Sequence, residues 1–123
     1  MSQPLKSSQK QYIEWLRRSS TRQRQLPKEK LEHAWESARQ AAQLLRERYN
    51  VNRVRVFGSL LYLNRFHDKS DIDLAVEGLS VHNYWDALAD VLFLDNSITV
   101  DIVEPDTCPP TLWAIIEQEG VDI

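Results

Sequence analysis

Apolar residues recur at helical spacing in four stretches of the chain, and each stretch predicts a helix. The clearest covers residues 27–49, where a proline suited to a first helical position precedes apolar side chains at three- and four-residue intervals. Shorter patterns cover residues 8–19 and 84–94, and a fourth opens at Pro109-Pro110 and ends at Gly120. These helices separate stretches of a different period.

Three β-rich runs lie between the predicted helices. Residues 53–57 alternate charged side chains with valine and phenylalanine, which predicts a strand with one buried face; residues 71–76 and 98–103 carry similar patterns. A short helical segment, residues 60–63, follows the first strand. The order of elements predicts an α/β (α+β) fold with a small mixed sheet flanked by helices, in which residues 1–26 form a basic tail with a short helix and residues 27–123 form a single domain.

Gly58 and Ser59 form a turn directly after the first predicted strand. Glycine lets the backbone approach a ligand closely, and Ser59 is a good N-cap for the following helical segment. Unpaired backbone N–H groups at such a helix start suit an anion. The turn therefore predicts a phosphate-binding site.

Three acidic residues lie in the other two β-rich runs. Asp71 and Asp73 are two positions apart, so a strand projects both to one face, and Asp101 occupies the middle of the third run. Like charges this close repel unless a cation lies between them, and hard oxygen ligands suit magnesium. A divalent cation is therefore expected beside Asp71 and Asp73, and Asp101 supplies a third carboxylate to the same sheet face.

The motifs Val56-Phe57-Gly58-Ser59, Asp71-Ile72-Asp73-Leu74 and Val100-Asp101-Ile102 resemble the DNA polymerase β-like nucleotidyltransferase superfamily, and within it the minimal single-domain members. The likeness covers roughly residues 51–105 and implies a palm-like core in which the sheet face that carries the three acids stays open and holds the functional site. It implies that the glycine-serine turn holds nucleotide phosphates and that the three acids bind two magnesium ions and perform catalysis. Arg65 and Lys69 are the nearby cations left to bind the nucleotide, because residues 60–63 are leucines and a tyrosine where relatives carry arginines.

Minimal nucleotidyltransferases of this kind are similar to the antitoxins of HEPN/MNT toxin–antitoxin systems. That likeness implies AMP transfer from ATP to a tyrosine hydroxyl of a HEPN ribonuclease toxin as the partner. Two alternatives remain open from the sequence. The chain could mask its partner by binding alone, which the arginine-poor segment after Ser59 favours, or it could modify a small molecule. Residues 60–63 are candidates for touching the partner, and core packing is the competing interpretation for them.

Charge divides the chain into two unlike parts. Of 15 Lys and Arg and 18 Asp and Glu residues, most of the basic ones fall in residues 1–50 and most of the acidic ones in residues 51–123. We interpret the basic part as a solvated helical face that steers an anionic nucleotide or an acidic partner, although such segments also bind nucleic acid. The acidic part argues against duplex DNA binding by the core.

Cysteine and hydropathy patterns predict a cytoplasmic protein without a membrane segment, since Cys108 has no disulfide partner within the chain and no apolar run is long enough to span a bilayer. We expect Cys108 to be structurally incidental. His67 and His82 lie in a polar loop and at a helix start, where exposed or capping roles are expected, and His33 lies in a charged helix with no partner that the sequence identifies.

Overall fold

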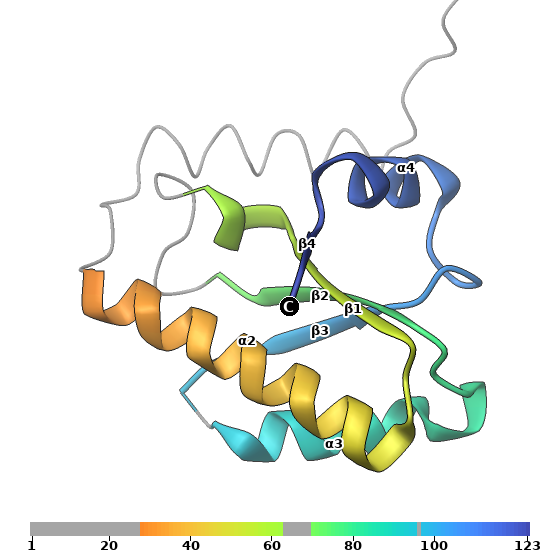
Figure 1. Cartoon of the computed structure of the whole chain (residues 1–123), viewed down its shortest axis with the longest axis horizontal. Helices are drawn as coiled ribbons and strands as arrows, with labels where there is room; N and C mark the ends of the chain where they lie inside the picture. The colour runs from red at the N-terminus through yellow and green to blue at the C-terminus, as the bar shows by residue number, and fades with distance from the viewer. Residues whose placement is uncertain (1–27, 63–69, 96) are drawn as a thin grey trace, which may run out of the picture.

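A mixed four-stranded sheet with helices on both faces organises the computed structural model, which describes residues 28–62, 70–95 and 97–123 (Figure 1). The strand order is β3-β2-β1-β4; β1 is antiparallel to both β2 and β4, and β2 is parallel to β3. The elements are α2 Lys28–Tyr49, β1 Arg53–Phe57, the 3₁₀ helix η1 Gly58–Leu61, β2 Ile72–Glu77, the 3₁₀ helix η2 Val81–Asn83, α3 Tyr84–Leu94, β3 Val100–Val103, α4 Pro110–Glu119 and β4 Val121–Asp122.

The main core lies between one sheet face and the helices α2 and α3. Alternate residues of the strands point into it, because side chains of a strand alternate between the two faces. The buried strand residues are Val54, Val56, Ile72, Leu74, Val76, Val100 and Ile102, and α2 contributes Ala34, Ala38, Ala41, Ala42, Leu44 and Leu45. The four alanines give α2 a narrow apolar face that can approach the sheet closely. This core fixes the register that brings the acidic residues together.

The opposite sheet face is partly covered by α4, which corrects the expectation that this face is open. Phe57 and Ala75 pack there against Cys108 and Ile116 in a second apolar cluster. β1 is correspondingly buried on both faces, although its sequence pattern predicts one buried face, and Arg55 is only 1% exposed. The part of the face near Asp73 and Asp101 lies beyond this cluster.

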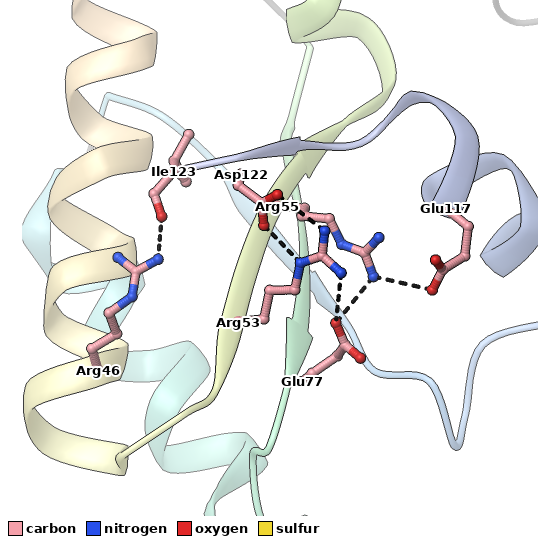
Figure 2. A network of polar contacts seen from close by, with 7 residues as sticks. All are labelled: Arg46, Arg53, Arg55, Glu77, Glu117, Asp122 and Ile123. Carbon is pink, nitrogen blue, oxygen red and sulfur yellow. Dashed lines mark hydrogen bonds and ion pairs between the residues drawn. The ribbon is translucent and has the colours of Figure 1, made fainter.

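Arg55 lies between the acidic side chains of Glu77 and Glu117 (Figure 2) and also contacts an aromatic ring of α4. One of its terminal nitrogens lies 3.0 Å from a Glu77 carboxylate oxygen and 3.4 Å from one of Glu117, and its guanidinium lies 5.3 Å from the Trp113 ring centroid. Within the described ranges of the chain, its Nε has no hydrogen-bond partner. Next to this group, Arg53 binds Asp122 of β4 through two hydrogen bonds of 2.7 and 3.0 Å. Polar contacts therefore attach both α4 and β4 to β1.

Most predicted elements are confirmed within a residue or two. The helix predicted over residues 27–49 begins at Lys28, and the helix over residues 84–94 has the predicted bounds. β2 begins at Ile72, so Asp71 precedes the strand, and β3 begins at Val100 instead of Ile98. The two-residue strand β4 and the short helix η2 are not predicted. The helix expected over residues 8–19 lies outside the described residues.

Candidate active site

Asp73 and Asp101 are direct neighbours on the adjacent parallel strands β2 and β3. Each alternates with residues of the main core, so both point to the sheet face opposite α2 and α3. Asp71, one residue before β2, is exposed and acts electrostatically on both neighbours. The three acids predicted from the sequence therefore gather at one end of the β2–β3 pair.

Burial and mutual repulsion raise the pKa of the Asp73 and Asp101 carboxyl groups. Burial, followed by the charges of Asp101 and Asp71, raises the pKa of Asp73 to about 7. Burial also raises the pKa of Asp101, against a backbone hydrogen bond from Ile102 that lowers it, and Asp71 adds to the rise. A nearby cation would favour the charged form of each group. The site is thus one in which a bound cation and the ionised carboxylates stabilise each other.

Gly58 brings the backbone of the turn directly against Asp73. Phe57 pairs with Asp73 across β1 and β2, so the next residue along the chain lies at the carboxylate. Gly58 has a φ of 77°, and a Cβ at this position would lie 2.6 Å from Asp73 Oδ2. Only glycine fits here without displacing the acid. The turn and the acids therefore form a single site.

Ser59 does not cap a helix, and that prediction is wrong. It lies inside η1, where Phe57 occupies the N-cap position and no side chain caps the helix. The Ser59 hydroxyl is buried and has no hydrogen-bond partner among the residues that the structure describes. An unsatisfied buried hydroxyl costs about 1–3 kcal/mol, so functional sites are among the places where such groups are retained. The hydroxyl fits an oxygen ligand that arrives at the turn.

Magnesium fits the chemistry of this donor set. Among the described residues, no group of three or more His, Cys, Asp or Glu side chains is arranged to hold a metal ion. Magnesium in phosphoryl-transfer sites is held by one or two carboxylates together with substrate phosphates and water. Asp73 and Asp101 supply such a pair, while Asp71 adds charge beside it.

The apolar segment after the turn contributes to the core. Leu60 is buried in the main core and Leu61 packs against it, which confirms the core-packing interpretation for both. Tyr62 follows, and its hydroxyl lies 2.7 Å from a Glu119 carboxylate oxygen of α4. Arg65 and Lys69, the predicted nucleotide-binding cations, lie outside the described residues.

Sequence reasoning missed two polar groups near the carboxyl end of β3. Glu104, immediately after β3, is buried, and one of its carboxylate oxygens has no hydrogen-bond partner in the described part of the chain. Burial, followed by the charge of Asp106, raises its pKa. Tyr84 donates a hydrogen bond of 3.2 Å to the Ile102 carbonyl, and burial, then Asp101, raises the pKa of its hydroxyl. An acid at the carboxyl end of a predicted strand could have signalled Glu104. Nothing in the local sequence indicates the Tyr84 contact.

The remaining candidate residues from the sequence are the three histidines and Cys108. His33 has a partner that the sequence did not identify, since its Nε2 lies 2.6 Å from Asp95 Oδ2, and Ser37 donates to the same oxygen at 3.0 Å. His82 is exposed in η2 and its backbone N–H is capped by Ser80. Cys108 is buried and free. His67 lies outside the described residues. No described helix has the length and apolar character needed to cross a membrane.

Solved structures share this fold, while comparison with protein families and with curated proteins gives no match. One of these structures is a candidate minimal nucleotidyltransferase, 26% identical, with a TM-score of 0.62 over 76% of this chain and 95% of that chain. Another is the crystal structure of the toxin–antitoxin MntA-HepT, 20% identical, with a TM-score of 0.53 over 72% of this chain and 69% of that chain. The predicted fold is confirmed: the chain has the α+β fold of a minimal nucleotidyltransferase.

Proposed function

We propose that this chain is a magnesium-dependent nucleotidyltransferase that acts as an antitoxin, transferring AMP from ATP to a tyrosine hydroxyl of a HEPN ribonuclease toxin in the cytoplasm. The observation that carries the enzymatic part is the contact of the Gly58 turn with Asp73, with Asp101 in register beside it. The likeness to a candidate minimal nucleotidyltransferase supports it. The antitoxin role rests on the sequence motifs, and the fold shared with MntA-HepT agrees with it.

In the proposed reaction, the acceptor hydroxyl oxygen attacks the α-phosphorus of ATP, the bond from that phosphorus to the bridging oxygen breaks, and pyrophosphate leaves. Asp73 and Asp101, joined by Asp71 once the ions are bound, would hold two magnesium ions, whose chemistry is to lower the pKa of the attacking hydroxyl and to neutralise charge on the leaving group. The Gly58 backbone and the Ser59 hydroxyl position the phosphates, with Arg65 and Lys69 as counter-charges. Asp101, which is exposed, accepts the proton of the attacking hydroxyl.

Substitution of the paired acids tests this function. We expect Asp73→Asn and Asp101→Asn each to lower magnesium-dependent transfer from labelled ATP by about 100-fold or more, because each loses a carboxylate that would hold magnesium at the reacting phosphate. Asp106→Asn, which removes an exposed acid outside the pair, is the matched control and should retain activity. Circular dichroism establishes that the variants fold. Full transfer by either site variant would refute the mechanism.

Masking of the partner without chemistry is the second candidate. Two observations favour it: leucines follow the turn where cations were expected, and no three-ligand metal group is present among the described residues. Mass spectrometry of the partner after incubation with this chain, ATP and magnesium separates the two functions. A gain of one or more AMP units supports transfer, whereas inhibition of the partner without a mass change supports masking.

A further inference from the structure

An apolar stripe on the outer face of α3 is exposed to solvent. Trp85, Ala89, Leu92 and Phe93 follow one another at the i, i+4, i+7 and i+8 positions that share one helix face, and Val81 in η2 precedes them. Trp85 is 76% exposed, Phe93 82% and Val81 70%. The buried positions of the same helix, Ala87 and Val91, face the core instead. α3 lies beside α2 and β3 at the margin of the fold (Figure 1).

The exposed Trp85 side chain is oriented by the ring of its neighbour Tyr84. Its ring lies edge-on to the Tyr84 ring, with centroids 5.1 Å apart and planes at 83°. Tyr84 is in turn fixed by its hydrogen bond to the Ile102 carbonyl in β3. A large aromatic side chain that is already oriented loses little conformational entropy on binding, and such residues often dominate the energy of an interface. An exposed apolar stripe of this kind is typical of a binding surface.

The charges around the stripe define the complementary surface. After Lys69 the chain contains no lysine or arginine, so all charged groups of α3 are acidic. Asp90 is engaged with Tyr49 and Arg48 of α2, whereas Asp86 forms no ion pair within the described part of the chain. Asp95 follows the last residue of α3 and is bound by His33 and Ser37, at a helix end where the dipole also favours cations. The surface that fits this stripe is therefore apolar and bordered by lysine or arginine.

We propose that the exposed face of α3, comprising Val81, Trp85, Ala89, Leu92 and Phe93, is the docking surface for the protein acceptor. This inference rests on the proposed function and adds the surface at which the acceptor binds. The occupant is a second protein that offers an apolar groove rimmed by basic side chains, into which an amphipathic helix face fits. Tyr84 attaches α3 to β3, which carries Asp101 and is the edge strand of the sheet. The carboxylates point to the opposite sheet face, so an acceptor docked on α3 reaches them around this edge.

Other occupants fit the stripe less well. Two copies related by a two-fold axis would bring each unpaired Asp86 towards acidic groups of the other copy, and like charges facing each other oppose association. Membrane-surface helices carry lysine and arginine beside their apolar face, because cytoplasmic lipid surfaces are negatively charged. The acidic border of α3 is the reverse of that arrangement.

Binding measured without catalysis tests the surface. The probe is the purified product of the gene adjacent to this one, titrated calorimetrically into the full chain carrying Asp101→Asn, without ATP or magnesium. We expect the double variant Trp85→Glu/Phe93→Glu to raise Kd by about 100-fold or more. Asp86→Lys should raise Kd several-fold and reduce its dependence on salt. The matched control is Ile115→Glu, which places the same charge at an exposed apolar residue of α4 and should leave Kd within about threefold of the parent.

Each outcome separates the docking surface from the catalytic proposal. Unchanged affinity of the double variant, no binding of the parent to the probe, a self-association that the double variant abolishes, or sedimentation of the parent with anionic vesicles would each overturn the inference. Loss of binding in the double variant, with thermal unfolding unchanged, supports it. If the otherwise unmodified chain docks through α3 and yet adds no AMP to the probe, the docking surface stands and the proposed transfer fails.

Discussion

Gly58 is a residue whose identity is dictated by its neighbour. Alanine at this position would need a left-handed backbone and would place its Cβ 2.6 Å from Asp73 Oδ2. We expect Gly58→Ala to reduce the free energy of unfolding by about 1–3 kcal/mol and to lower nucleotide transfer strongly, because the acid is displaced. Urea unfolding and labelled ATP measure the two effects.

Gly78 provides the control for that substitution. Its φ is 92°, and its Cβ would lie 2.7 to 2.9 Å from atoms of Asn52, away from the acids. Gly78→Ala should therefore cost similar stability while the folded fraction retains full transfer. If the two variants lost transfer equally per folded molecule, the special role of the Gly58 contact would be disproved.

Asp73 predicts how the stability of the metal-free protein depends on pH. Its pKa is about 7 in the folded state against an ordinary 3.8, so the folded protein retains a proton that the unfolded chain loses. Asp73 therefore lowers the free energy of unfolding as pH rises from about 4 to about 7, and its effect is constant above that range. Asp73→Asn removes this contribution and should be more stable than the parent at pH 8 by roughly 1–3 kcal/mol.

The measurement for Asp73 is urea unfolding in EDTA at pH 4.5 and pH 8. At the lower pH the two proteins should differ little, because the carboxyl group is then largely protonated in the folded state. If Asp73→Asn were less stable than the parent at pH 8, the ionised Asp73 carboxylate would not be destabilising the folded protein.

Individual site residues differ in how far the sequence predicts them. Gly58, Asp73 and Asp101 are recognisable because each depends on a local pattern, either a glycine after a strand or an acid between core residues. The surroundings of Ser59 are not predictable in this way, because an N-cap and an interior position of a four-residue helix have the same local sequence. Glu104 and Tyr84 depend on packing between elements distant in the sequence.

Arg55 of β1 contacts Glu117 of α4, so its effect on stability depends on how these two elements are held together. Arg55→Ala should reduce the free energy of unfolding by about 3–5 kcal/mol, because it leaves a void and removes the partner of Glu77 and Glu117. Arg55→Met should recover more than half of that loss, since an unbranched side chain refills the space under Trp113 while Glu77 and Glu117 retain access to water. Urea unfolding gives both values.

Hydrogen exchange in α4 completes the test of Arg55. The amides of α4 should exchange faster in Arg55→Ala than those of α2, because only α4 is attached through this network. Uniform acceleration throughout the fold would show that Arg55 supports the whole core and not one helix.

Elements are predicted well where their pattern is long. α2 and α3 carry several turns of apolar spacing, and tertiary packing agrees with their local preference. β4 contains only two residues, both exposed, and it is held by pairing with β1 and by the Arg53–Asp122 contact instead of by a pattern of its own. Its existence depends on the rest of the fold, which explains why it was not predicted.

At the scale of the whole molecule, the fold class follows from the order of elements, but the covering of the sheet does not. Alternation within β1 indicates one apolar face and one charged face, and charged faces normally meet water. Here α4 returns over the charged face because Glu77, Glu117 and Trp113 together accommodate Arg55. A buried charged residue that is paired with opposite charges therefore gives the same alternating sequence pattern as an exposed one.

The position of β4 has a consequence for the order in which the molecule can be completed during synthesis. β1, which leads into Gly58, is paired on one side by β2 and on the other by β4, and the Ile123 amide donates to the Val54 carbonyl at 3.1 Å. A nascent chain that has passed Asp101 already contains every predicted site residue, yet one edge of β1 is still unpaired. Until residues 121–123 emerge, that edge is open to strands of other chains, so this is the interval in which the protein is most exposed to aggregation.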